Sequence, residues 1–242
     1  MVAVTERVTR RDADRSASSS DLLHSGDHLD RETFHRLYLQ TPEGFKAELI
    51  NGVVYVASPV SRGHSVPNGT LVGCFFVYEA NTPGVERGDN GTVFLTPDRD
   101  EVQPDAMLMI RPEYGGAVQY AGDGDHFIAG GPELVVEVAT SSAAIDLHDK
   151  LDAYERAGVR EYVVLSTKTP ELFWYENREG RFVRLDPPGD GIFRSAVFPG
   201  LWLNAAAIVA NDSKTVLETV QAGLADPAHE KFIAELARRK AT

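Results

Sequence analysis

The chain contains a single cysteine, Cys74, and no long uninterrupted run of apolar residues. A lone cysteine cannot form a disulfide within the chain, and it excludes a metal cluster held by thiolates. Because no apolar run approaches the ~18 residues that a membrane span requires, we expect no integral membrane protein. The N-terminal segment also lacks the apolar stretch of a secretory signal. These absences predict a protein of the reducing cytoplasm.

Basic residues are scarce: 24 lysines and arginines stand against 36 aspartates and glutamates, for a formal net charge of −12. Proteins that bind duplex DNA usually carry a basic surface, because neutralisation of phosphates supplies much of the affinity. The clearest basic clusters lie near the two ends of the chain, within residues 7–15 and 231–240. The composition argues against extensive DNA contact. It leaves open one local positive groove, a weak or partner-dependent DNA binder, or a different substrate.

Several motifs of other enzyme classes are missing. The sequence has no G-x-x-x-x-G-K-[ST] phosphate loop, no G-x-S-x-G nucleophile elbow and no H-E-x-x-H zinc motif. Residues 123–126 fall short of a calcium-loop pattern and are interpreted as an ordinary loop. Nucleotide-dependent phosphoryl transfer, esterase chemistry and zinc proteolysis are therefore set aside.

The 242 residues are enough for one substantial core with a small appendage. Residues 1–26 are polar and serine-rich without periodicity, which predicts a disordered arm. Residues 27–204 are predicted to form a single domain. Residues 205–242 are predicted to form two short helical segments that break at Asp226-Pro227, as an accessory tail.

Apolar periodicity and turn signals predict the elements of the domain. Asp30 is a plausible N-cap for a helix that ends near Gln40, and Asn51-Gly52 is the strongest hairpin signal in the chain. Helices are predicted at 65–81 and 142–157, the second closed by Gly158. Strands are predicted at 45–50, 53–57, 92–95, 105–110, 134–139, 161–166, 171–175, 181–185 and 193–198, with a glycine-rich loop at 115–131. This order favours an α/β (α+β) fold with a mixed central sheet.

Two acidic residues accompany the predicted core strands. Asp105 follows Pro104 at the start of an apolar strand, and Glu137 lies in the middle of the apolar run at 134–139. A carboxylate inside a buried strand is unfavourable unless it is paired or binds a metal. Two carboxylates are able to hold Mg²⁺ while it keeps waters for chemistry. The alternative is that one acid marks a strand end and the other faces solvent.

The helix after the Glu137 strand contains Asp146, Lys150 and Tyr154 at a spacing of four residues. Two acids and a nearby lysine are the components of a Mg²⁺-dependent phosphodiesterase, in which the ammonium stabilises charge in the transition state. We expect Asp146 and Tyr154 to hold Lys150 in place. The alternative is an exposed lysine that pairs with Asp146 on the helix surface.

The segment from Pro132 to Ser141, followed by Asp146, Lys150, Tyr154 and residues 158–162, resembles the Uma2 family. That family belongs to the restriction-endonuclease-like proteins of the PD-(D/E)xK nuclease superfamily. Upstream, residues 48–52 resemble the family's early acid and hairpin turn, His64 its helix-opening histidine, and Pro104-Asp105 its PD motif. The resemblance runs from about Leu29 to Leu203 and implies a restriction-endonuclease-like mixed sheet flanked by helices.

The resemblance also implies roles for individual residues. Asp105 and Glu137 are the expected metal ligands, together with the backbone carbonyl of Val138, and Lys150 is the expected catalytic cation. Glu48 is the family's early acid, expected to bind a second metal or to order the site, with an ordinary cross-strand glutamate as the alternative. His64 is expected either to contact phosphate or to be structural. Many relatives have a lysine at the position of Ala139, which puts catalysis in question.

Three functions remain in competition. The first is a DNA endonuclease that depends on Mg²⁺ (or Mn²⁺), acts as a homodimer and cuts both strands of a duplex. The second is a weakly active or inactive protein of the same fold that serves as a binding or regulatory module, favoured by the acidic composition and by Ala139. The third is a metal-dependent hydrolase of another phosphate ester.

Overall fold

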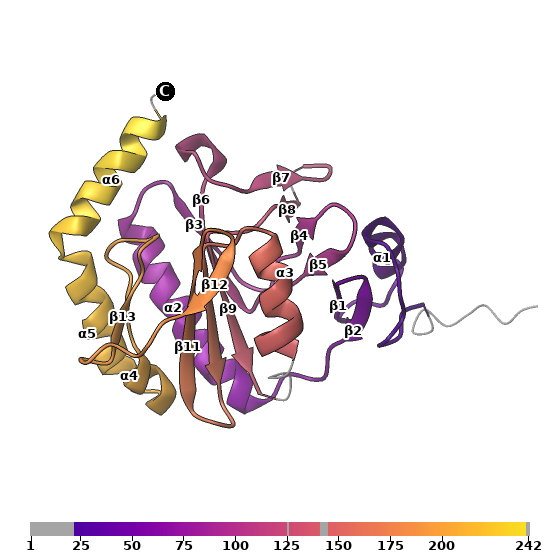
Figure 1. Ribbon diagram of the computed structural model, residues 1–242, viewed down its shortest axis with the longest axis horizontal. Helices are drawn as coiled ribbons and strands as arrows, with labels where there is room; N and C mark the ends of the chain where they lie inside the picture. The colour runs from indigo at the N-terminus through magenta and orange to yellow at the C-terminus, as the bar shows by residue number, and fades with distance from the viewer. Residues whose placement is uncertain (1–21, 125, 141–144, 241–242) are drawn as a thin grey trace, which may run out of the picture.

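The computed structural model describes residues 22–124, 126–140 and 145–240 (Figure 1). A central mixed sheet has the strand order β12-β11-β10-β9-β6-β3, in which β9 and β10 are parallel and the other neighbours antiparallel. Its strands are β3 (Val85–Gly88), β6 (Ala106–Ile110), β9 (Leu134–Ala139), β10 (Glu161–Ser166), β11 (Glu171–Arg178) and β12 (Arg181–Arg184). The predicted α/β fold with a mixed central sheet is confirmed.

A second six-stranded sheet was not expected. Its order is β2-β1-β5-β4-β8-β7, and it contains the predicted N-terminal hairpin. Its strands are β1 (Ala47–Ile50), β2 (Val53–Val56), β4 (Val93–Thr96), β5 (Asp100–Val102), β7 (Gln119–Ala121) and β8 (Phe127–Ala129), while β13 (Ile192–Arg194) pairs with β14 (Trp202–Asn204) separately. The glycine-rich stretch predicted as a loop therefore contains β7 and β8, which are too short to show a periodic pattern.

Helices lie on both sides of the central sheet (Figure 1). Six α-helices occur in the described residues: α1 (Arg31–Tyr38), α2 (Arg62–Asn81), α3 (Lys150–Arg156), α4 (Ala205–Ala210), α5 (Ser213–Leu224) and α6 (Pro227–Lys240). A 3₁₀ turn spans Pro112–Tyr114, and a π-helical turn spans Ile145–Asp149 directly before α3. None of the described helices is long and apolar enough to cross a membrane.

Alternation along β9 explains why this strand is apolar throughout. Leu134, Val136 and Val138 face a core formed with α2 and the C-terminal helices, whereas Val135 and Ala139 face a core that contains residues of α3 and the second sheet. We call these two the helix-side core and the site-side core. Because both faces are covered, no position of β9 is exposed. Glu137 shares the parity of Val135 and Ala139, and therefore lies on the site-side face.

Local signals place the ends of several elements correctly. Asn51 and Gly52 have φ values of 55° and 76°, the left-handed pair that a tight hairpin between β1 and β2 requires. Asp30 caps α1, since its Oδ1 accepts a hydrogen bond of 2.8 Å from the Thr33 amide. Gly158, with φ 76°, follows the end of α3 as predicted. The helix predicted from residue 142 is an α-helix only from Lys150, and residues 142–144 lie outside the described residues.

Two predicted boundaries change. Most of the predicted disordered arm, residues 1–21, lies outside the described residues, but residues 22–26 pack on the domain. Leu23 is buried against Phe34 and Val54, and the Gly26 amide donates to the Val54 carbonyl over 2.8 Å. A short polar segment with one apolar anchor lacks the periodicity that would have revealed this packing.

The C-terminal residues form three helices where two segments were expected, and they are not an accessory tail. Val216 and Val220 of α5 and Phe232 and Leu236 of α6 belong to the helix-side core. His229 of α6 is buried, with Nε2 2.9 Å from the Thr82 hydroxyl at the end of α2. The predicted break is confirmed, because α5 ends at Leu224 and α6 begins at Pro227.

Candidate active site

Asp105 and Glu137 lie opposite each other on adjacent strands. In the antiparallel pairing of β6 with β9, Ala106 faces Val136, so Asp105, one residue before β6, is opposite Glu137 in the continued register. Residues directly opposite in an antiparallel pair project to the same face of the sheet. The two carboxylates therefore share the site-side face. Asp105 does mark a strand start, but the alternative that the other acid faces solvent is wrong, because Glu137 is buried.

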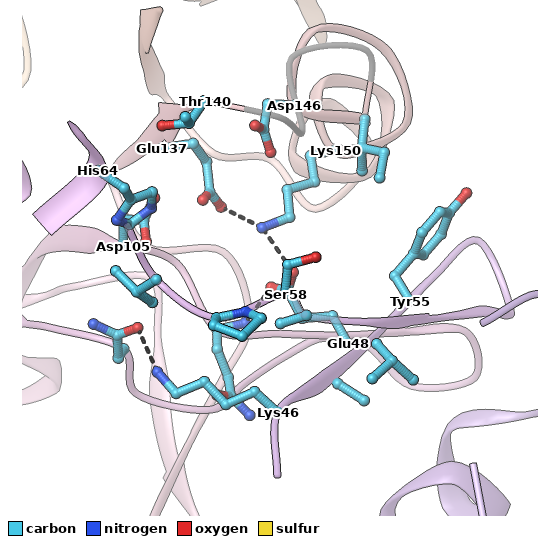
Figure 2. Close-up of a pocket in the computed structure, with 18 of the residues that line it drawn as sticks. Lys46, Glu48, Tyr55, Ser58, His64, Asp105, Glu137, Thr140, Asp146 and Lys150 are labelled. Carbon is cyan, nitrogen blue, oxygen red and sulfur yellow. Dashed lines mark hydrogen bonds and ion pairs between the residues drawn. The ribbon is translucent and has the colours of Figure 1, made fainter. Parts of the chain in front are cut away.

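Both acids line a cavity of about 540 Å³ between the two sheets (Figure 2). Asp105 and Glu137 come from the central sheet, Glu48 from β1, and His64 from the first turn of α2. Asp146 and Lys150, which precede and begin α3, and Lys46, directly before β1, complete the charged lining. The tertiary structure thus gathers four carboxylates, two lysines and one histidine from five separate segments.

Glu137 is buried, with a relative exposure of 3%. Its Oε1 accepts a hydrogen bond of 2.9 Å from the Lys150 ammonium and one of 2.7 Å from the Tyr154 hydroxyl. Burial raises the pKa of Glu137 well above its ordinary value, because the attraction of Lys150 does not offset burial together with the charges of Asp105, Asp146 and Glu48. The carboxylates are in excess over their cations, and a further cation would stabilise the ionised state.

Lys150 is buried at 4% exposure, so the alternative of a solvent-exposed helix lysine is wrong. Its Nζ lies 2.9 Å from both Glu137 Oε1 and Glu48 Oε2. Burial by itself lowers the pKa of Lys150, but the charges of Glu137, Glu48 and Asp146 outweigh burial and hold the pKa well above its ordinary value. Lys150 is therefore a cation throughout the physiological pH range.

Glu48 uses both of its oxygens inside the protein. Oε2 contacts Lys150, and Oε1 accepts a hydrogen bond of 2.7 Å from the Gln103 amide, two residues before Asp105. Glu48 is thus neither an ordinary cross-strand glutamate nor a carboxylate with a free oxygen. It ties β1 to the segment that carries Asp105 and to the first residue of α3. That Glu48 orders the site or binds a second metal stays a prediction.

Asp105 is held by two donors on a single oxygen. Its Oδ2 lies 3.0 Å from His64 Nε2 and accepts a hydrogen bond of 2.7 Å from the Val138 amide. Burial alone would raise the pKa of Asp105, but these hydrogen bonds and the charges of His64 and Lys150 keep the pKa below its ordinary value. The pairing with Asp105 also raises the pKa of His64. Asp105 is therefore ionised, and His64 fixes its orientation.

The expected partners of Lys150 are only partly as predicted. Tyr154 contacts Glu137 instead of Lys150, because both side chains point from α3 toward the same strand. Asp146 is buried at the cavity wall, and its charge favours the charged form of Lys150. The spacing of Lys150 and Tyr154 indicated a shared helix face. It did not indicate which carboxylate they reach.

The model of the Uma2 family, described as "Putative restriction endonuclease", matches residues 31–206, which is most of the chain. The chain belongs to the Uma2 family. The matched region includes every charged residue of the cavity described above.

A solved structure supports the fold of this Uma2 chain. A crystal structure described as "a putative nuclease belonging to DUF820", from Anabaena variabilis ATCC 29413, superposes with a TM-score of 0.57. The match covers 72% of this chain and 96% of the other, at 13% sequence identity, and therefore shows a common fold. No curated protein matches the chain.

The donor set of the Uma2 chain fits a divalent metal held by few protein ligands. Among the described residues, hydrogen bonds to the two acids use Asp105 Oδ2 and Glu137 Oε1, which leaves Asp105 Oδ1 and Glu137 Oε2 for a ligand. The Val138 carbonyl points to the same side of β9 as the Val138 amide, which donates to Asp105. No three His, Cys, Asp or Glu side chains of the described residues form a ready metal cage. Mg²⁺ does not require one, because it retains several waters.

Ala139 lies on the same strand face as Glu137, and it is fully buried. Strand β9 therefore carries no lysine or arginine. The Lys150 ammonium reaches Glu137 from α3 instead. His64 was expected either to contact phosphate or to be structural, and in the structure its ring contacts Asp105. Its position in the first turn of α2, after the serine-rich segment 58–61, was the available signal, but only the folded chain shows that the ring reaches Asp105.

Proposed function

We propose that the protein is a Mg²⁺-dependent (or Mn²⁺-dependent) DNA endonuclease that hydrolyses phosphodiester bonds. The observation that carries the proposal is the opposition of Asp105 and Glu137 on one sheet face, beside a buried lysine. Membership of a family described as "Putative restriction endonuclease" supports the same class of reaction. The excess of carboxylates over cations in the cavity supports the binding of a divalent cation.

Each residue has a distinct role in this proposal. Asp105 and Glu137 hold the metal through their remaining oxygens, with the Val138 carbonyl as a third donor. A bound divalent cation supplies a more acidic water as nucleophile and neutralises charge on the phosphate. Lys150 stabilises the charge that develops on the phosphate oxygens in the transition state. Glu48 and Tyr154 fix Lys150 and Glu137, and His64 fixes Asp105, so that the groups are oriented before the substrate binds.

A metal titration combined with a cleavage assay tests the proposal. Calorimetry of the purified protein with Mg²⁺ or Mn²⁺ should show binding that Asp105→Ala and Glu137→Ala abolish. The same variants should lose metal-dependent cleavage of plasmid DNA. Asp186→Ala, at an exposed position outside the cavity, is a matched control that should leave both properties unchanged. Metal binding that persists in both site variants would contradict the proposal.

The second candidate is a binding or regulatory module with the same fold. The net charge of −12 favours it, because an acidic composition does not support strong DNA binding. The buried Ala139 also favours it, because many relatives have a lysine at this position of the glutamate strand. Under this alternative the protein binds the metal in the calorimeter but shows no metal-dependent cleavage of duplex or single-stranded DNA. Cleavage by the parent that Lys150→Ala reduces would exclude it.

A further inference from the structure

The mouth of the cavity has its own cation, Lys46. Lys46 and Glu48 lie two residues apart on the β1 segment, so their side chains project to the same face, and both line the cavity (Figure 2). Glu48 reaches inward to Lys150, whereas Lys46 is exposed to solvent. The buried Lys150 is held by two carboxylates, so it cannot leave to meet a ligand at the entrance.

The partner of Lys46 is a neutral group. Its Nζ donates to the Asn90 side-chain oxygen over 3.0 Å, and no ion pair with a carboxylate was found for it among the described residues. Many other cations of the described chain are paired with acids, for example Arg87 with Glu79 and Arg156 with Asp100. The charge of Lys46 is therefore not neutralised, and an ammonium with three donors has donors left for a ligand.

Asn90, the partner of Lys46, is itself held by hydrogen bonds. Its backbone is left-handed, with φ 53°, and its amide donates to the Pro104 carbonyl over 3.0 Å. Its side-chain nitrogen donates to Asp89 Oδ1 over 2.5 Å, so the amide oxygen faces Lys46. Because Pro104 directly precedes Asp105, these contacts link Lys46 to the segment that carries the candidate metal ligand. Such an arrangement places a positive charge at a defined position beside the reacting centre.

We propose that Lys46, oriented by Asn90, binds a backbone phosphate next to the one that is cleaved. This inference rests on the proposed nuclease function and deepens it, by assigning a separate phosphate subsite on the nucleic-acid strand. The inner cavity is lined by four carboxylates, which repel an approaching phosphodiester. An unneutralised cation at the entrance offsets that repulsion and fixes which phosphate reaches the centre. Lys46 is a binding residue in this scheme and takes no part in bond cleavage.

A phosphate-by-phosphate binding assay tests the subsite. The probes are short fluorescein-labelled DNA strands, single and duplex, in which one phosphate at a time is replaced by an uncharged methylphosphonate. Fluorescence anisotropy is measured without divalent metal, so that cleavage cannot occur. The proteins are the parent, Lys46→Ala, Asn90→Gly and Lys214→Ala. Glycine keeps the left-handed backbone of residue 90, and Lys214 is an exposed lysine of α5 outside the cavity.

We expect Lys46→Ala to weaken binding about tenfold. The slope of log K against the logarithm of the salt concentration should become shallower by roughly 0.7 to 0.9, the value of one phosphate contact. One methylphosphonate position should weaken the parent but not Lys46→Ala. Asn90→Gly should show a smaller loss at that same position, and Lys214→Ala none. Lys46→Ala should raise the KM for DNA cleavage, since the cation acts on binding.

The possible failures are distinguishable. If the parent binds and cleaves DNA, but Lys46→Ala keeps the parent's affinity, salt dependence and methylphosphonate profile, the subsite is wrong and the nuclease function stands. If the parent neither binds the probes nor cleaves DNA with Mg²⁺ or Mn²⁺, the proposed function fails and the subsite fails with it.

Discussion

The ammonium of Lys150, at the start of α3, lies 2.9 Å from Glu137 Oε1 on β9, and both groups are buried. A buried pair of this kind is seldom retained for stability, because desolvation of the two charges offsets much of their attraction. Here the pair lies in a cavity with three further carboxylates, among them Glu48, which contacts the same ammonium. Under the proposed function, the pair is retained for chemistry at the cavity.

The first prediction concerns the charge balance of the site. Glu137→Gln keeps an oxygen that accepts from Lys150 and Tyr154 but removes one negative charge from the cluster. Relief of like-charge repulsion should leave the melting temperature of the metal-free protein unchanged or higher, by about 2–4 °C for each kcal/mol relieved. Thermal melts with and without Mg²⁺ provide the measurement. Mg²⁺ should raise the melting temperature of the parent and have no effect on the variant. Unfolding of Glu137→Gln under native conditions would instead mark Glu137 as structural.

The second prediction concerns Lys150 as the charge-stabilising group. Lys150→Ala should reduce the cleavage rate by roughly 10²- to 10³-fold, as expected for the loss of one positioned electrostatic group. Metal affinity should stay within a few-fold of the parent, because Lys150 is not a ligand. Lys150→Arg should restore little activity, since a planar guanidinium does not reproduce a compact ammonium between two carboxylates. Single-turnover cleavage checks the rate, with Lys214→Ala as the surface control. Parental activity in Lys150→Ala would assign this role to another residue.

The third prediction concerns Glu161 at the start of β10, away from the cavity. This glutamate is 1% exposed, and it accepts hydrogen bonds from the Ser195 hydroxyl at 2.5 Å and the Ala196 amide at 2.8 Å. Burial raises the pKa of Glu161 to about 7, above its ordinary value of 4.5. The fold therefore favours the protonated carboxyl. The resulting stability is fully present below pH 4.5 and is lost as the pH rises toward 7, by about 1.4 kcal/mol per pH unit.

Denaturant unfolding at several pH values measures this effect. Glu161→Gln is neutral at every pH, so its free energy of unfolding relative to the parent should rise between pH 4.5 and 7 and level off above. A pH-independent loss of stability in Glu161→Gln is added to this pH-dependent difference, because an amide cannot reproduce both hydrogen bonds. The difference in slope is the diagnostic quantity. Glu218→Gln, an exposed position on α5, should follow the parent. Parallel curves for Glu161→Gln and the parent would contradict the prediction.

The fourth prediction concerns the C-terminal helices. Phe232 and Leu236 of α6 are buried in the helix-side core, so Phe232→Ala and Leu236→Ala should each lower the free energy of unfolding by about 2–5 kcal/mol. Leu217→Ala, on the half-exposed face of α5, should cost much less. A single cooperative denaturant transition in each variant is part of the expectation. If the C-terminal residues were an accessory tail, neither core substitution would affect the main transition.

Much of the local structure could be predicted from the sequence. The strands 134–139 and 161–166 have the predicted bounds, because a short apolar run bounded by turn residues is a local signal. The Asn51-Gly52 turn and the Asp30 cap were predictable for the same reason, since each depends on the backbone preferences of a few neighbouring residues. Asp105 and Glu137 stood out because a carboxylate beside or within an apolar run is costly.

The tertiary structure decided which of these residues meet. No local pattern shows that β1 belongs to a second sheet, that Glu48 reaches Lys150 across the cavity, or that His64 reaches Asp105. Strand pairing and helix packing are set by the fit of surfaces distant in the chain. The sequence therefore did not indicate the strands β7 and β8, or the packing of α6 into the core. The sequence alone determined which carboxylates are unusual. Only the fold determined their partners, because hydrogen bonds and Coulomb interactions depend on distances that chain spacing does not fix.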